Sequence, residues 1–475
     1  NVYNVAVGFE AGKAVTTGTL NTFVGGLAGD AFTDAQHNTA IGYQALTSDT
    51  QGDRSVAVGS NTLNSQNGVN GNVYNTAVGY GAGQNVTSGV QNTLVGGLAG
   101  DALTDADFNV AIGYNALTSD TLGSRSVAIG RSALEVQNFT TSTDAYNVAV
   151  GMDAGAKVTT GVENTLIGGL AGDALNTGQQ NVAVGTYALT TDTKGNKNVA
   201  VGRLALADQN FTTSTDSYNV GVGFAAGGDI TTGTNNTFVG GLAGDGTDDG
   251  DENVAVGRSA LSANCGDANT AVGKDAGEII TGSNNTVLGK SAGKQITSGG
   301  NNTAVGKDAG LSGSPGGAIT TGSNQIALGD ENVSSFFAQV ALTVSSDERD
   351  KTDFVDLDLG LDFVKALEPV TYYWDKRSKY GDKYADDYDL DAQTPDGTHK
   401  EDWMDVGFKA QSVQALEEAA GYKLSDKKNL TVSLSADEKQ YGLRYEKFVP
   451  ILVKAIQDQD AIIQSLTARI AALES

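Results

Sequence analysis

A short motif of the form N-[VT]-x-[VI]-G returns at almost regular intervals through the first two-thirds of the sequence. Most intervals are 17 residues, and in the first part every fourth one is longer, so the motif groups into cassettes of 71 or 72 residues. A fixed short period is typical of a solenoid, in which each turn buries its apolar side chains by stacking on its neighbours. The motif starts at Asn4, Asn21, Asn38, Ser55, Asn75, Asn92, Asn109, Ser126, Asn147, Asn164, Asn181, Asn198, Asn219, Asn236, Asn253, Asn269, Asn285 and Asn302.

The residue types within each turn indicate which solenoid this is. A β-branched aliphatic residue usually stands three positions after the start, and an alanine usually stands seven positions after it. Alternate residues of a strand point to opposite faces, so Val5 and Val7 share one face while Ala6 points to the other. The alanine suits a narrow interior, the glycine after the aliphatic residue lets the backbone turn, and no helical apolar stripe is present. The sequence therefore predicts a mainly β fold, namely a parallel β-solenoid of about nineteen rungs with a length of ~90 Å. We expect the leading asparagines of successive rungs to stack as an amide ladder.

The stretch NTFVGGLAGD, from Asn21 to Asp30, looks like a glycine-rich phosphate loop and returns nearly unchanged in the second turn of each cassette. A phosphate loop needs a strand before it and a helix N-terminus after it, whereas another turn and another strand follow here. We therefore interpret the stretch as a structural rung. The aspartates that end it are interpreted as solvated turn residues, with cation binding as the alternative; they are Asp30, Asp101, Asp173 and Asp245.

Charge and residue usage argue against several classes of function. The chain carries 56 Asp and Glu against 30 Lys and Arg, a net charge of -26, and such a surface repels nucleic acid and anionic membranes. The single cysteine, Cys265, excludes an intrachain disulfide framework, and two histidines, His37 and His399, are too few for a histidine-rich metal centre. No apolar run approaches the ~20 residues of a membrane span. We expect no cofactor, no metal, no nucleic-acid partner and no membrane insertion.

The fourth turn of each of the first three cassettes carries extra residues, which include the stretches NSQNGVNGNVY, EVQNFTTSTDAY and ADQNFTTSTDSY. In solenoids such insertions become loops on one side, frequently the binding side. Their aromatic residues could stack on the sugars of a host receptor, and the candidate receptor-binding residues are Phe139, Tyr146, Phe211 and Tyr218. The alternative is that these aromatic residues fill a groove between the subunits of a trimer.

The composition changes near residue 334, where glycine becomes rarer and charge, tryptophan and helical spacing appear. We expect a solenoid shaft over 1–333, a connecting strand or linker over 334–345, and an α+β domain over 346–475.

Four segments of the C-terminal domain have a predictable structure. Leu359, Phe363, Ala366 and Leu367 fit one face of a helix that stops before Pro369. The sequence VTYYW reads as a strand, the polar stretch from KYGDKY to KEDW reads as an arm or insertion, and GFKAQSVQALEEAAGY starts another helix.

The last residues carry a heptad seam that predicts a coiled coil over 448–474. Isoleucine and leucine at its core positions favour two strands, whereas a fibrous shaft favours three; we follow the shaft and predict a homotrimer. The seam consists of Val449, Leu452, Ile456, Gln459, Ile463, Leu466, Ile470 and Leu473.

The repeat over residues 1 to about 333 resembles the heads of trimeric autotransporter adhesins, whose repeats also read Asn-Ser-Val-Ala-Ile-Gly, and the repeats of phage tail-fibre shafts. Its period of 17 is longer than the usual adhesin-head repeat. The resemblance implies a fibrous, trimeric surface rod and no particular receptor.

The residues after 345 resemble the C-terminal intramolecular chaperone of phage endosialidases, tailspikes and tail fibres. Four ordered blocks carry the likeness: SDERDK at 346–351, LGLDFVKALEPVTYYW at 359–374, GFKAQSVQAL at 407–416 and YEKFVPILVKAIQDQDAIIQSLTARIAALE at the end. Members of that family help three chains fold into a β-structured stalk and then cut themselves off with a serine-lysine dyad. The resemblance implies that Ser346 is the nucleophile, that Lys351 is its general base, and that the scissile bond joins Ser345 to Ser346.

The chemistry of this pair is plausible independently of the resemblance. A serine hydroxyl is a weak nucleophile until a base takes its proton, and a lysine can do so where burial lowers its pKa. Asp347 and Asp350 flank the pair and would oppose such a change unless they point away. The alternative is a solvated loop in which a serine and a lysine happen to lie five residues apart.

These features together predict a homotrimeric viral tail fibre or spike for host attachment, with a chaperone domain that cleaves itself once and no other enzymatic activity. The protein would reside in the virion, after its chaperone acts in the host cytoplasm, and would bind a host receptor or glycan. Because the sequence opens in mid-pattern, we expect a preceding part that contacts other tail proteins. The alternatives are a bacterial trimeric adhesin and a tailspike that degrades polysaccharide, which would need paired carboxylates in a groove.

Overall fold

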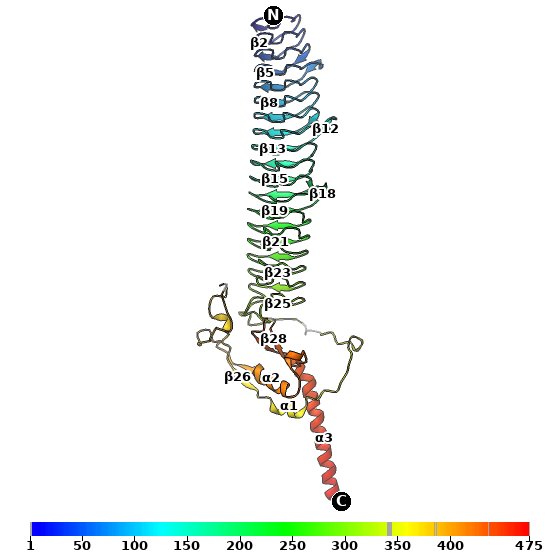
Figure 1. Cartoon of the computed structure of the whole chain (residues 1–475), viewed down its shortest axis with the longest axis vertical. Helices are drawn as coiled ribbons and strands as arrows, with labels where there is room; N and C mark the ends of the chain where they lie inside the picture. The colour runs from blue at the N-terminus through cyan, green and yellow to red at the C-terminus, as the bar shows by residue number, and fades with distance from the viewer. Residues whose placement is uncertain (1, 340–343, 384, 386, 436, 475) are drawn as a thin grey trace. The chain divides into compact units, whose positions relative to one another are not determined.

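The computed structural model describes residues 2–339, 344–383, 385, 387–435 and 437–474. The chain divides into two compact units, Asn1–Asn285 and Thr286–Ser475; Figure 1 shows the rungs of the first unit in blue to green. The last rungs of the shaft therefore group with the C-terminal part. The division predicted at 333 from the change in composition, and at 346 from the resemblance, stays a prediction.

The first unit is the predicted parallel β-solenoid, which is confirmed. Each rung contributes one three-residue strand that begins one residue after a motif start, and consecutive strands pair in parallel, as Val127 does with Val110 and Val148. The strands of this ladder are β1 (Val5–Val7), β2 (Thr22–Val24), β3 (Thr39–Ile41), β5 (Val56–Val58), β7 (Thr76–Val78), β8 (Thr93–Val95), β9 (Val110–Ile112), β11 (Val127–Ile129), β13 (Val148–Val150), β14 (Thr165–Ile167), β15 (Val182–Val184), β17 (Val199–Val201), β19 (Val220–Val222), β20 (Thr237–Val239), β21 (Val254–Val256) and β22 (Thr270–Val272).

Side chains alternate between the interior and the surface of each rung. The middle residue of each strand from β2 onward is buried, as at Ala40, Ala57 and Leu94, and so is the alanine seven positions after the start, as at Ala45 and Ala82. The interior is therefore narrow and filled mainly by small side chains, as predicted. The residues on either side of each middle residue face outward.

The leading asparagines form the predicted amide ladder inside the solenoid. The Asn75 side-chain carbonyl accepts a hydrogen bond from the backbone N–H of Asn92 at 2.9 Å, and the Asn92 amide donates to the carbonyl of Ala106 at 2.8 Å. Both asparagines are fully buried. Because each amide bonds the backbone of the next rung, the ladder satisfies polar groups that water cannot reach.

The long fourth rungs fold back on the solenoid and are held by a second, two-residue parallel pairing. Where the motif starts with serine, the asparagine ladder lacks one side-chain amide, and a buried glutamine of the long rung supplies an amide in its place. Gln137 Nε2 donates a hydrogen bond to Ser126 Oγ at 3.1 Å, and Gln137 Oε1 accepts one from the Asn147 side chain at 2.8 Å. In Figure 1, β12 and β18 mark two of these insertions on one side of the rungs. The pairs are β4 (Gly52–Asp53) with β6 (Gly71–Asn72), β10 (Gly123–Ser124) with β12 (Thr143–Asp144), and β16 (Gly195–Asn196) with β18 (Thr215–Asp216).

The second unit begins with three further rungs. They contain β23 (Thr286–Leu288), β24 (Thr303–Val305) and β25 (Ile326–Leu328), and β24 pairs in parallel with the other two. The strand β25 lies outside the repeated motif, because glutamine, Gln325, replaces the leading asparagine there.

A small α+β region follows the rungs, as predicted. It contains α1 (Leu361–Ala366), α2 (Ala410–Ala419) and α3 (Phe448–Glu474), with β26 (Val370–Tyr372) antiparallel to β27 (Asp405–Gly407) and β28 (Val432–Leu434) antiparallel to β29 (Tyr441–Leu443). Single 3₁₀ turns lie at η1 (Glu348–Asp350), η2 (Arg377–Lys379), η3 (Leu424–Asp426) and η4 (Tyr445–Lys447).

One detail of the predicted elements is wrong. Leu359 precedes α1 because the backbone at Gly360 is not helical, and Leu367 is the C-cap of the helix and has an extended backbone. For 334–345 we expected a strand or a linker, and the described residues there, 334–339 and 344–345, form no strand; residues 340–343 lie outside the described part of the chain.

The core of this region joins α3 to the smaller elements. Leu359, Phe363, Val413, Val432, Phe448 and Ile451 form one buried cluster. The first turns of α3 therefore pack on the chain's own core, whereas the side chains of the predicted heptad seam are all exposed.

Candidate active site and other predicted site residues

Ser346 and Lys351 lie on either side of a single 3₁₀ turn, and their side chains touch. Asp347 begins that turn, η1, and its side chain accepts a hydrogen bond from the backbone N–H of Arg349 at 2.9 Å. The turn reverses the chain, so Lys351 Nζ lies 2.5 Å from Ser346 Oγ and 3.2 Å from the Ser346 carbonyl oxygen. The predicted nucleophile and base are thus within proton-transfer distance.

Arg349 holds the neighbouring acid away from the lysine, a role that the sequence analysis missed. Its guanidinium donates to both Asp347 oxygens, at 2.6 Å from Nη2 and 3.1 Å from Nε. Hydrogen bonding by Arg349 lowers the pKa of Asp347, and the same pairing raises the pKa of Arg349. The acid beside the nucleophile is therefore neutralised by its own arginine.

The segment around this pair is exposed in a single chain. Ser345, Ser346 and Lys351 are all exposed, and so are the large apolar side chains of Phe336 and Phe337, at 76% and 92%. Within one chain, the described residues leave the Lys351 side chain exposed to water.

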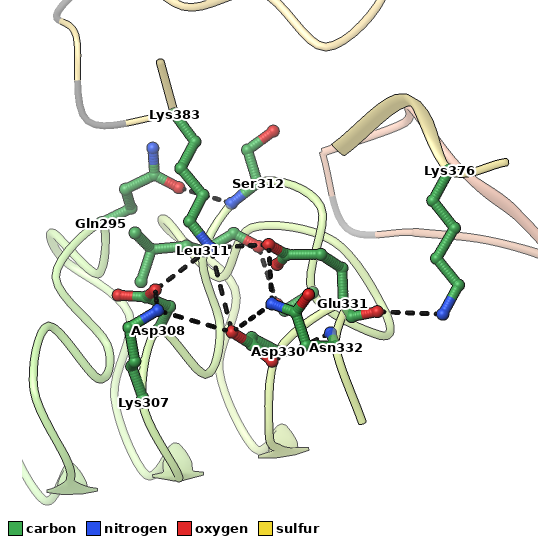
Figure 2. Close-up of polar contacts among 11 residues, drawn as sticks. Gln295, Lys307, Asp308, Leu311, Ser312, Asp330, Glu331, Asn332, Lys376 and Lys383 are labelled. Carbon is green, nitrogen blue, oxygen red and sulfur yellow. Dashed lines mark hydrogen bonds and ion pairs between the residues drawn. The ribbon is translucent and has the colours of Figure 1, made fainter. Parts of the chain in front are cut away.

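A second cluster ties the C-terminal region to the last rungs, and Figure 2 shows it. Lys383 Nζ lies 2.8 Å from Glu331 Oε1 and 3.1 Å from Asp308 Oδ2, with Asp330 at 4.0 Å. Lys376 Nζ donates to the Glu331 carbonyl at 2.9 Å. Burial alone would lower the pKa of Lys383, but its hydrogen bonds to Glu331 and Asp308 outweigh burial and raise that pKa. The stretch predicted as a polar arm thus carries a nearly buried cation onto the last rungs.

The predicted receptor-binding aromatic residues separate into two pairs. Phe139 and Phe211 are each only 6% exposed, so they pack into the long rungs and their rings cannot stack on a ligand. Tyr146 and Tyr218 are 52% and 49% exposed. For those two, contact with another molecule stays a prediction.

Charged side chains contact the rings of the two exposed tyrosines, Tyr146 and Tyr218. The Arg125 guanidinium lies 5.8 Å from the Tyr146 ring centre, and Lys197 Nζ lies 5.1 Å from the Tyr218 ring centre and donates to its hydroxyl at 3.0 Å. Such cation–π contacts stabilise an exposed ring in place.

Three of the four turn aspartates accept a hydrogen bond from the next rung instead of being freely solvated; the fourth, Asp245, has a buried side-chain oxygen without a partner among the described residues. Thr47 donates to Asp30, Thr118 donates to Asp101, and Thr190 Oγ1 donates to Asp173 at 2.5 Å. Burial raises the pKa of Asp101.

No group of three or more metal-ligating side chains occurs within the described part of the chain. Cys265 is buried and unpaired.

Comparison with known proteins identifies one part of the chain. Residues 346–422 match the family described as the chaperone of endosialidase, so a chaperone domain of that kind follows the β-solenoid. The match begins at Ser346. Neither the curated proteins nor the solved structures contain a match to the chain. In the part of the chain that the structure describes, none of the helices combines the length and apolar character needed to cross a membrane.

Proposed function

We propose that the chain is a homotrimeric phage tail-fibre or spike protein for host attachment, and that its chaperone domain releases itself by cleaving the Ser345–Ser346 bond. The observation that carries the self-cleavage is the 2.5 Å contact between Lys351 Nζ and Ser346 Oγ at the first residue of the chaperone match. The exposed seam of α3 supports assembly, since a heptad stripe without a partner is covered when helices from several chains wind together.

The position of the serine relative to the cut determines the chemistry. Ser346 follows the scissile bond, so its Oγ reaches the Ser345 carbonyl carbon through a five-membered ring. Lys351 takes the hydroxyl proton as the O–C bond forms, and it returns that proton to the Ser346 nitrogen as the C–N bond breaks. Water then hydrolyses the ester between Ser345 and Ser346 Oγ, which leaves a carboxylate on Ser345 and a free amine on Ser346.

The exposure of the pair makes the reaction conditional on assembly. Lys351 acts as a base only when it is uncharged, and in a single chain water surrounds it. We expect neighbouring chains to cover the loop, together with Phe336 and Phe337, so that cleavage follows trimer formation. The rod then loses the part that assembled it and is held by a high unfolding barrier.

The test is the intact mass of the purified full chain beside three variants. The wild type should yield two fragments, 1–345 and 346–475, whereas Ser346→Ala and Lys351→Met should stay whole. Ser345→Ala is the matched control: it keeps the nucleophile and should still be cut. A wild type that stays whole under conditions where it is trimeric would contradict self-cleavage, and cutting of Ser346→Ala would exclude this serine.

A further inference from the structure

One outward face of the first unit consists of four columns of side chains, which we call the outer sheet face. In each rung they occupy the position before the motif start and the first, third and fifth positions after it. In the rung that starts at Asn147 they are Tyr146, Val148, Val150 and Met152, and they alternate with Asn147 and Ala149, which are fully buried.

The two central columns are apolar or neutral in every rung of the first unit. Only valine, isoleucine and threonine occur there, from Val5 to Val272, with no charged residue. These side chains reach solvent: Val78, Ile112 and Val239 are each 37% exposed. A sheet face that stays in water normally carries polar side chains, and soluble monomers rarely expose long continuous apolar patches. The outer sheet face therefore has the composition of a surface that another molecule covers.

The two outer columns have the composition of an interface margin. The first rungs of the cassettes place aromatic residues or methionine at both edges, with Tyr74 and Tyr80, Tyr146 and Met152, and Tyr218 and Phe224, all about half exposed. Aromatic residues, methionine and arginine are the types enriched at protein interfaces. Between these rungs the margins hold mainly glycine, arginine, lysine and uncharged polar residues.

Charge distinguishes a second copy of this chain from other occupants. Identical chains that meet at one face bring the same charges together, so acids there would repel. The chain has a net charge of -26, yet the outer sheet face contains only two acids, Glu163 and Glu252. Several of its cations are already paired, as Arg131 is with Asp153 at 2.9 Å and Lys197 with Asp216 at 2.5 Å. An anionic glycan would therefore find few free cations and no hydrogen-bonding groups other than threonine on the central columns.

We infer that the outer sheet face is the interface between copies of this chain, and that each copy in the proposed trimer turns it toward the other two. Because all rungs share one spacing, the faces of identical chains pack rung against rung over the whole first unit. The inference rests on the proposed trimer and adds which surface forms it. It also assigns Tyr146 and Tyr218 to the margin of that interface instead of to a receptor.

The test places a cysteine on the face and on another part of the same rung. Met152→Cys and Thr160→Cys, both at exposed positions, are each made in the full chain with Cys265→Ser, and each is treated with a two-armed maleimide. Met152→Cys should give covalent dimers, whereas Thr160→Cys should give no dimers although it labels readily with a one-armed maleimide. Sedimentation of the same samples measures whether the chains are trimeric.

The outcomes separate the two proposals. If the protein is a trimer but Met152→Cys labels freely with a one-armed maleimide and does not cross-link, the proposed interface is wrong and the proposed trimer is not. The outer sheet face would then be available to a receptor. A monomeric protein would overturn the trimer itself. Cross-linking at Thr160→Cys alone would place the interface elsewhere on the rung.

Discussion

At the scale of single residues, the glycine that follows each aliphatic residue is required by contact between rungs as well as by conformation. Gly113 has φ 139°, and a Cβ on it would lie 2.4 Å from the carbonyl oxygen of Gly130 in the next rung. The next position is often glycine too, but a Cβ would have room there: at Gly97 the nearest atom, in the Tyr114 ring, would lie 3.5 Å away, and at Gly241 nothing lies within 4 Å. The stacking of rungs therefore requires the first glycine of the repeated GG of NTFVGGLAGD but not the second.

Gly113→Ala should lower the unfolding midpoint of the shaft markedly. A positive φ costs a non-glycine residue about 1–3 kcal/mol, and here the added methyl group also collides with backbone that cannot yield. Gly71→Ala is the matched control, because Gly71 also has a positive φ, 101°, but nothing lies within 4 Å of its Cβ position. Thermal unfolding followed by circular dichroism measures both. Equal effects would show that the inter-rung contact adds nothing.

At the scale of elements, the long fourth rung is held by a buried acid and a buried amide. Asp120 accepts hydrogen bonds from Gln137 Nε2 at 2.6 Å and from the backbone N–H groups of Gly123 and Phe139 at 3.0 and 3.1 Å. Burial raises the pKa of Asp120, and these hydrogen bonds offset only part of the change. The insertion is therefore built into the core by the same network that completes the asparagine ladder.

The raised pKa of Asp120 has a definite effect on acid stability. The folded state binds a proton at Asp120 more tightly than the unfolded state does, so protonation of Asp120 stabilises the folded protein. This stabilisation is complete below the pKa that Asp120 has in the unfolded chain, and it is lost as pH rises through the pKa that Asp120 has in the folded protein. The stability advantage of the wild type over Asp120→Asn should therefore grow as pH falls from about 7 to about 4. Melting temperatures at several pH values test this, with the exposed Asp34→Asn as control. An advantage that shrinks in acid would contradict it.

At the scale of the whole molecule, a cation in the C-terminal region anchors a polar segment to the last rungs. Lys383 is 12% exposed and lies among Asp308, Asp330 and Glu331, of which Asp308 is fully buried. If cleavage occurs at Ser345–Ser346, Lys383 departs with the chaperone while the three acids remain with the rungs. In that case the contact belongs to the uncut protein.

Lys383→Met should loosen this anchor in uncut protein, which the Ser346→Ala background provides. Glu331 loses its lysine in this variant, whereas Lys307 Nζ still lies 2.7 Å from Asp308 and 3.8 Å from Asp330. The cost should therefore fall below the ~3–5 kcal/mol of a buried pair that loses its one partner. Hydrogen exchange should rise around 375–391 and in the last rungs. Lys365→Met removes an exposed pair with Asp362 and should change neither region. Unchanged exchange in Lys383→Met would mean that other contacts hold the segment.

The sequence alone determined the period, the strand positions, the asparagine ladder, α3 and the spacing of Ser346 from Lys351, because each depends on residues close in the chain or on an exact repeat. Tertiary structure decided what depends on distant partners. It buried Phe139 and Phe211 while leaving Tyr146 and Tyr218 in solvent, and it brought Lys383 to acids in the last rungs. It also turned the valine columns outward, since alternation along a strand defines two faces but only the closed rung decides which one encloses the core.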